Sequence, residues 1–264
     1  MHTIIYFCKT HYRIYFKLLK NDFKSRYVGS YLGIIWGFIQ PIITVLIYWF
    51  VFTVGLRSGE RPDGTPYIIW MIAGLLPWFY FSDALGAITN SFIEYSYMVK
   101  KLNFRIGLLP FVKAGSSIII HIVFLIFTTI IFNFYSYNAN WIYFQLLYYM
   151  VATTLLVIGI GLITSTLAVY LRDTSQIVAI IIQIGFWAIP IVWGPEVLGN
   201  KWGILFKANP VYFLIEGYRD TLIRNTYIWE EPLYHLYFWF ITILVWTIGI
   251  SVFRKLKPYF ADVL

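Results

Sequence analysis

Six long apolar segments limit what this chain can fold into. A helix needs about 20 mostly apolar residues to cross a bilayer, and six stretches of the 264-residue chain reach or approach that length. Only 12% of the residues are charged, against about 25% in a typical soluble domain, so this chain cannot cover a soluble globule with polar surface. The pattern predicts an all-α integral membrane protein with spans at 31–54, 67–89, 111–134, 144–170, 177–193 and 236–253.

The distribution of basic residues predicts the orientation of these spans. Six spans place both termini on one side of the membrane. With the N-terminus inside, the inner segments hold 14 of the 20 lysines and arginines and the outer segments hold 6. Because cytoplasmic segments carry the excess of Lys and Arg, we expect both termini in the cytoplasm. The same excess accounts for the net charge of +8 without nucleic acid as a partner.

The chain reads as a single membrane domain over 1–264, because no charged, proline-rich or Gly/Ser-rich linker divides it. One cysteine, Cys8, excludes a disulfide framework within the chain and a Cys-rich metal site. The predicted order is an amphipathic segment at 9–30, five spans within 31–193, an outer segment at 194–235, a sixth span at 236–253 and a tail at 254–264.

The segment before the first span carries two stripes at helical spacing. One stripe is basic and the other is aromatic and apolar, which predicts an amphipathic helix lying on an anionic cytoplasmic leaflet. The helix is either a plain surface anchor or a docking face for a soluble partner, and one helix can serve both purposes. The basic stripe consists of Arg13, Lys17, Lys20 and Lys24.

A short basic loop lies between the second and third spans. Tyr97, Lys100, Lys101 and Arg105 lie there among apolar residues, and a short cytoplasmic helix fits the pattern. The basic residues alone need no function beyond fixing the topology. A contact with another protein is the alternative.

The outer segment between the fifth and sixth spans is apolar but interrupted. Asn209 and Pro210 divide it into two pieces, each too short to span the membrane. After Pro210, apolar residues recur at helical spacing, Glu216 and Arg219 can pair at i,i+3, and Asp220 can pair with a basic residue at i,i+4. We expect two short helices that dip into the outer leaflet, acting either as a functional element or as inert packing.

Asp83 is the clear carboxylate within the predicted spans. Charges inside a membrane are costly and mark functional sites by default, which makes Asp83 a polar candidate. It lies six residues from the predicted inner end of its span, so a place near the inner surface is the alternative.

Several motifs of catalysis and energy conversion are missing from the sequence. There is no G-x-x-x-x-G-K-[ST] phosphate loop, no H-E-x-x-H and no Cys/His spacing for a metal. A transporter with this sequence therefore needs its energy from another chain. The 22 tyrosines, 23 phenylalanines and 11 tryptophans present flat apolar faces, some with polar edges, a chemistry that suits membrane interfaces and sugar rings.

Three motifs in order resemble the transmembrane subunit of ABC-2 type exporters. "GSYLGIIWGFIQPIITVLIYWFVF" at 29–52 is similar to the family's first span, "YLRDTSQIV" at 170–178 to its Arg-Asp turn, and "NPVYFLIEGYRDTLI" at 209–223 to its Asn-Pro-x-x-x-x-Ile-Glu-x-x-Arg segment. The resemblance covers nearly the whole chain. Within the family it points to the polysaccharide branch, the permeases for O-antigen, capsule and teichoic acid.

The resemblance implies a homodimer in the bacterial inner membrane with two copies of a cytoplasmic ATPase, which would bind ATP and Mg in place of this chain. It implies a lipid-linked polysaccharide as the substrate, moved outward through a channel at the dimer interface. It assigns 97–105 to a coupling helix that contacts the ATPase, 13–27 to an interface helix, and 203–223 to outer gate helices.

Two other readings stay open. The same ABC-2 fold could export a small lipid, a drug or an oligosaccharide, and neighbouring glycosyltransferase genes would favour the polysaccharide. A non-ABC carrier or a membrane enzyme would need a polar site within the spans, for which the sequence offers only Asp83.

Overall fold

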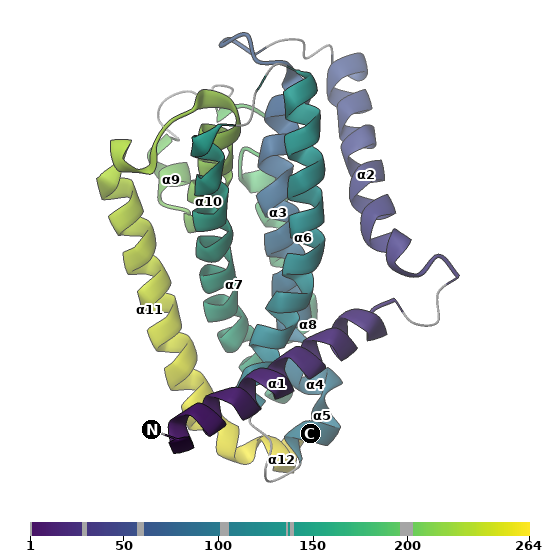
Figure 1. The fold of residues 1–264 in the computed structure, drawn as a ribbon, viewed down its shortest axis with the longest axis vertical. Helices are drawn as coiled ribbons and strands as arrows, with labels where there is room; N and C mark the ends of the chain where they lie inside the picture. The colour runs from purple at the N-terminus through teal and green to yellow at the C-terminus, as the bar shows by residue number, and fades with distance from the viewer. Residues whose placement is uncertain are drawn as a thin grey trace.

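The computed structural model describes residues 2–27, 31–56, 61–100, 106–135, 137, 140–195 and 203–264. Within these ranges the chain is a bundle of upright helices with a long N-terminal helix, α1 (His2–Ser25), lying across one end (Figure 1). Both termini lie at that end. Five helical segments of the described residues are long and apolar enough to cross a membrane, so the chain is an all-α, multi-pass membrane protein.

The upright helices follow the predicted spans closely. The first is a continuous helical stretch built from η1 (Gly33–Ile35), α2 (Trp36–Trp49) and η2 (Phe50–Gly55). α3 (Tyr67–Thr89) has the predicted bounds. α6 begins two residues before its predicted start, α7 begins one residue after its predicted start, and α11 extends four residues before and three residues after the predicted span. Their bounds are Leu109–Phe134, Gln145–Tyr170 and Pro232–Leu256.

The predicted fifth span is shorter than expected. α8 (Thr174–Ala188) ends five residues before the predicted boundary at 193. Ile189 is extended, with φ −93° and ψ 138°, and it precedes Pro190, whose ring disfavours a helical conformation in the residue before it. The 15 residues of α8 span about 22 Å, which is less than the thickness of the hydrocarbon layer of a bilayer.

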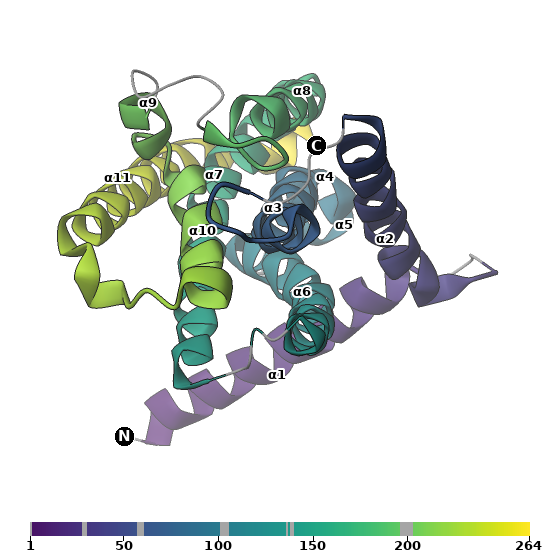
Figure 2. The same ribbon diagram turned by 90° about the horizontal axis from the view of Figure 1, so that it is seen from above.

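α3 forms the centre of the bundle. Viewed from above, α6, α7, α8 and α10 (Pro210–Arg219) surround it, whereas α2 stands at the rim (Figure 2). α3 has no polar stripe, and buried side chains lie along its whole length, as expected for a helix surrounded by protein. By contrast, none of the residues Trp36–Trp49, all of them described, is buried.

Small residues allow the closest helix contact. A Cβ atom at Gly249 of α11 would lie 2.9 Å from the Gly159 carbonyl oxygen of α7, so the backbones of the two helices touch at this point. Small residues permit such approach in membrane bundles, where packing rather than hydrophobicity drives association. Trp246 adds a side-chain bond across the same pair, donating from its indole nitrogen to the Leu155 carbonyl at 2.7 Å.

The non-spanning segments differ in detail from expectation. α1 begins at His2 rather than at the predicted residue 9. The basic loop holds two single-turn helices, α4 (Ser91–Glu94) and α5 (Ser96–Val99), in place of one. The outer segment contains α9 (Gly203–Lys207), α10 and η7 (Asp220–Arg224), in agreement with two short helices divided at Asn209.

Candidate functional site

A buried ion pair joins α1 to the bundle at its inner end. Asp22 of α1 is fully buried and lies 2.7 Å from the ammonium group of Lys113 in α6. Tyr95, between α4 and α5, donates a hydrogen bond to the same carboxylate at 2.8 Å. Lys113 also pairs with Glu94 at the end of α4. These contacts join α1, α6 and the basic loop into one unit.

Burial by itself raises the pKa of the Asp22 carboxyl, but the hydrogen bond and charge of Lys113 and the hydrogen bond from Tyr95 together bring the pKa below its ordinary value. A carboxyl with a lowered folded-state pKa contributes stability above its unfolded pKa of about 3.9, and loses it as the pH falls through the folded value. The attachment of α1 through Asp22 is therefore complete at neutral pH.

Asp83 lies near this unit rather than alone in the membrane. Its carboxylate accepts hydrogen bonds from Arg26 at 3.1 Å and from the Ser117 hydroxyl at 2.5 Å. Arg26 also lies 3.5 Å from Asp22. The side chain of Asp83 is 55% exposed. The intramembrane polar candidate is thus a partly exposed member of an inner-end ion pair.

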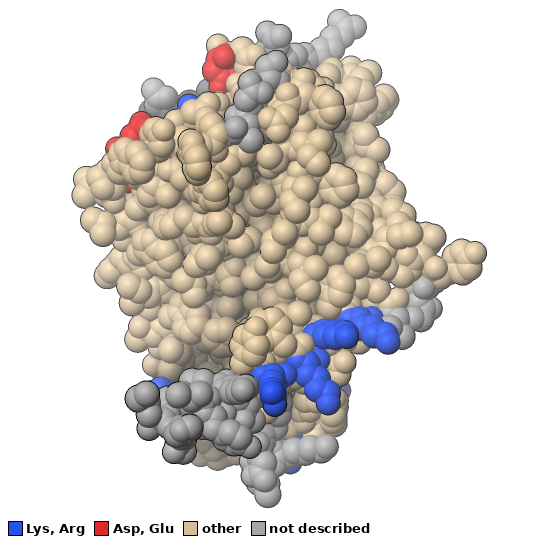
Figure 3. Space-filling view, viewed as in Figure 1, with Lys and Arg blue, Asp and Glu red and all other residues tan. Residues whose placement is uncertain are grey.

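The predicted basic stripe of α1 faces away from the bundle. Arg13, Lys17, Lys20 and Lys24 are all exposed, and Figure 3 shows lysines and arginines gathered along α1 at the inner end, with acidic residues at the opposite end. The opposite side of α1 carries the buried Leu18 and Asp22. The basic stripe thus lies on the exposed side of α1, while Tyr12 and Phe16 of the predicted aromatic stripe are exposed as well.

The predicted coupling segment is described only in part. Tyr97 is 56% exposed and Lys100 is exposed, whereas Lys101 and Arg105 lie outside the described residues. The preceding α4 rests on an apolar cluster that includes the chain's C-terminal end. In this cluster Phe92 stacks on Phe253 at 5.6 Å and contacts Phe260 of α12 (Phe260–Val263) at 5.3 Å.

The predicted outer residues lie together around α10. Asn209 caps this helix, its side-chain oxygen accepting from the Val211 backbone N–H at 2.9 Å, and Pro210 occupies the first turn. Glu216 pairs with Arg219 at 2.6 Å. Asp220 pairs with Arg224, which also reaches Glu216 at 2.8 Å.

Arg219 is the most deeply buried charge of this outer group, with no exposed surface. Its guanidinium donates to the carbonyl oxygens of Pro190 at 2.9 Å and Ile191 at 2.8 Å, just beyond the end of α8. It also lies 3.6 Å from the centre of the Trp70 ring in α3, within cation–π distance. Gly74 leaves room for it, since a Cβ there would lie 2.5 Å from the guanidinium.

A second contact holds α10 against the bundle nearer the membrane centre. Tyr218 and the His121 ring of α6 share a hydrogen bond of 2.8 Å. The same ring stacks on Tyr80 of α3 at 4.8 Å. His121 is therefore a packed, hydrogen-bonded residue that joins three helices.

Sequence reasoning missed the residues that act through tertiary contacts. Lys113 and Trp70 carry no local sequence signal for their contacts, because their partners Asp22 and Arg219 lie on other helices. Asp22 is the only acidic residue of α1. A single carboxylate in an otherwise basic helix could have indicated an ion pair with another segment. Among the described residues no group of His, Cys, Asp or Glu has the arrangement of a metal site.

Comparison with known proteins identifies the family. The family model described as "ABC-2 type transporter" matches residues 14–223. The chain belongs to the ABC-2 type transporter family. Its matched region takes in the second half of α1, the basic loop and the whole of α10, so the Asp22–Lys113 pair, the Arg219 contacts and the Tyr218–His121 hydrogen bond lie within the shared part of this ABC-2 chain.

Three relatives cover nearly the whole ABC-2 chain. Two are named O-antigen export system permease protein RfbA from Klebsiella pneumoniae; they are 26% and 25% identical over 250 and 251 residues, each covering 94% of this chain and 93% of the relative. A protein of the same name from Myxococcus xanthus is 24% identical over 249 residues, covering 93% of each chain. The similarity extends past the family model through the last span.

We expect Lys113→Met to loosen α1, because Asp22 would be buried without its ammonium partner. Removing one partner of a buried pair costs about 3–5 kcal/mol. Trypsin should then cleave faster within α1 in isolated membranes. The double variant Asp22→Leu/Lys113→Met should restore much of the protection, since apolar replacement of a whole pair is often neutral. Wild-type protection in Lys113→Met alone would contradict this role.

We expect Arg219→Met to destabilise the outer half of the protein by about 3–5 kcal/mol, because it leaves Glu216 with a weaker partner and two carbonyl groups without donors. The thermal unfolding midpoint in detergent measures the loss. Arg224→Met is the matched control; Arg224 is partly exposed, and ion pairs of exposed groups contribute only about 0–1 kcal/mol. Equal losses in both variants would contradict the special place of Arg219.

Proposed function

We propose that this chain is the permease subunit of an ATP-driven exporter that moves a lipid-linked polysaccharide, of the O-antigen type, outward across the bacterial inner membrane. The observation that carries the proposal is the name shared by relatives from two organisms, O-antigen export system permease, over 93–94% of the chain. The three sequence motifs that resemble ABC-2 type exporters agree with it.

The energy for this transport comes from a separate ATPase. The sequence has no phosphate loop, so ATP and Mg bind to two copies of a cytoplasmic partner. We propose α5 and Lys100 as its contact. Three neighbours of this segment support that role: Tyr95 bonds Asp22 of α1, Glu94 pairs with Lys113 of α6, and Phe92 stacks on α11. A force applied to α5 would reach three helices at once.

We propose that two copies of the chain form the exporter, with both termini of each copy in the cytoplasm. α2 has no buried residue and touches the rest of its own chain mainly near its ends. α8 likewise exposes Ile180, Ile184 and Trp187. A second copy packed against α2 and α8 would bury these faces, and the polymer would pass between the two copies.

The outer helices α9 and α10 would form the gate at the exit. Arg219 connects α10 to the end of α8 through the Pro190 and Ile191 carbonyls. If α8 lines the passage, a displacement of α8 during transport therefore shifts α10 as well. This contact provides a physical route from the moving helices to the outer surface.

Deletion of the gene tests the substrate. We expect lipid-linked glycan to accumulate on the cytoplasmic side and surface glycan to fall at least about tenfold, measured by extraction of lipid-linked glycan and by surface labelling. Expression of the intact chain should restore export, whereas a catalytically inactive partner ATPase should reproduce the deletion. Normal surface glycan together with retention of a drug or small lipid would overturn the polysaccharide assignment.

A charge reversal tests the ATPase contact. Lys100→Glu should weaken co-purification of the ATPase about tenfold or more, since a like-charge contact costs over 1.4 kcal/mol at an interface, while membrane insertion stays normal. Lys255→Glu is the control, an exposed lysine at the inner end of α11. If both variants retain the ATPase and full transport, Lys100 has no part in coupling.

A further inference from the structure

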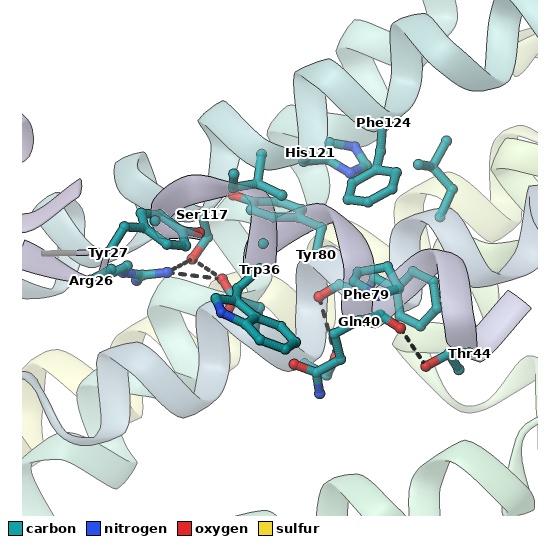
Figure 4. A pocket seen from close by; sticks show the side chains of 17 residues that line it. Arg26, Tyr27, Trp36, Gln40, Thr44, Phe79, Tyr80, Ser117, His121 and Phe124 are labelled. Atoms are coloured by element: carbon teal, nitrogen blue, oxygen red, sulfur yellow. Dashed lines mark hydrogen bonds and ion pairs between the residues drawn. The ribbon is translucent and has the colours of Figure 1, made fainter. Parts of the chain in front are cut away.

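A cavity at the inner end of the bundle lies beside the Arg26–Asp83 ion pair described above. It has a volume of about 560 Å³ and lies between the end of α1, the inner half of α2, and the facing sides of α3 and α6. Figure 4 shows side chains from all four segments around it, among them Arg26, Trp36, Gln40, Phe79 and Phe124. Its size is that of a small-molecule site.

The inner end of the cavity is polar and carries both signs of charge. Arg26 and Asp83 form its ion pair, and the Ser117 hydroxyl completes the contact. One guanidinium and one carboxylate give this part of the cavity no net charge. The carboxylate is the more accessible of the two, since the Arg26 side chain is 18% exposed and that of Asp83 is 55% exposed.

The part of the cavity nearer the membrane centre is mostly apolar. Leu76 and Phe79 of α3 and Phe124 of α6 line it there. These residues lie one to two helical turns further from the cytoplasmic end than Asp83 and Ser117 do. The cavity thus changes from charged to apolar along the direction of the bilayer normal, which matches the polarity of a membrane lipid.

The packing of α2 explains why the cavity exists. In its outer half α2 contacts the bundle through Tyr48, stacked on Phe186 at 5.3 Å, and the following η2 contacts it through Phe52 on Tyr67 at 5.6 Å. Nearer its inner end the ring contact is Phe38 with Phe124 at 5.5 Å. The gap that the helix leaves between these contacts is part of the cavity, which Gln40, Pro41 and Thr44 line from α2.

We propose that this cavity binds one zwitterionic phospholipid with a primary ammonium head. The ammonium group donates to the accessible Asp83 carboxylate, next to Trp36, and the phosphate lies beside Arg26, so both charges of the head meet an opposite charge. An anionic head without an ammonium group would meet Arg26 through its phosphate but would bring no cation to the exposed Asp83 carboxylate. A quaternary ammonium has no N–H group to donate. Phe79 and Phe124 contact the start of the acyl chains.

The lipid would fill the space between α2 and the bundle and hold the inner half of α2 at its present distance from α3. The proposal rests on the residues of this cavity and does not depend on the proposed substrate. Asp83, expected from sequence to be a functional carboxylate, would then be a lipid-binding residue.

The test uses the full chain together with its ATPase partner, placed in vesicles that contain equal amounts of phosphatidylethanolamine, phosphatidylcholine and phosphatidylglycerol. The complex is then purified from these vesicles. Native mass spectrometry then counts the retained lipids. We expect about one phosphatidylethanolamine per chain, enriched at least fivefold over each of the other lipids. Asp83→Asn should abolish the enrichment. Asp173→Asn, the same change at an exposed aspartate near the inner end but outside the cavity, should leave it intact.

A second variant keeps the test decisive if Asp83→Asn disturbs folding. Ile120→Trp fills the cavity from α6 and retains the Arg26–Asp83 pair, and it should displace the lipid. Equal retention of phosphatidylethanolamine in wild type and Ile120→Trp would overturn the proposal, because the lipid would then be bound elsewhere on the surface. Preference for phosphatidylglycerol, or a lipid-linked glycan in place of the phospholipid, would also overturn it.

Discussion

Backbone polar groups have no water to bond within a bilayer, and this constraint governs the whole structure. Helices satisfy it along their length, so the difficulty arises where a helix stops early. α8 stops at Ala188, before Pro190, and the following carbonyl groups cannot find donors in their own helix. Arg219 of α10 donates hydrogen bonds to two of these carbonyl groups, those of Pro190 and Ile191. The short helix and the re-entrant helix therefore depend on each other.

Arg219 in turn requires its own surroundings. A buried guanidinium is stable only when paired and hydrogen-bonded, and here Glu216 supplies the charge while the Trp70 ring covers its face. Gly74 supplies the space. Arg219 therefore links three helices. It bonds the chain beyond the end of α8, pairs with Glu216 within α10, and fits against Trp70 and Gly74 of α3. These contacts hold α10 against the centre of the bundle.

The inner end uses charge in a different way. Asp22 and Lys113 are both buried, and their pair joins the surface helix α1 to a spanning helix. The network continues through Glu94 and Tyr95 to the basic loop. It leaves the lysines and arginines on the other face of α1 free to meet the anionic leaflet or a partner. The same residues therefore position α1 and the basic loop, the two elements of the proposed ATPase contact.

Much of this protein was determined by sequence alone. Apolar length predicted the helices, the basic residues predicted the inner side, and Asn209–Pro210 predicted the division of the outer segment, because each signal is local along the chain. Tertiary structure decided which charges meet. Asp83 pairs with Arg26 57 positions away, Asp22 lies against Lys113 from another helix, and Arg219 reaches past α8 to Trp70. Helix rotation and crossing set these contacts, and neither follows from the spacing of residues within one helix.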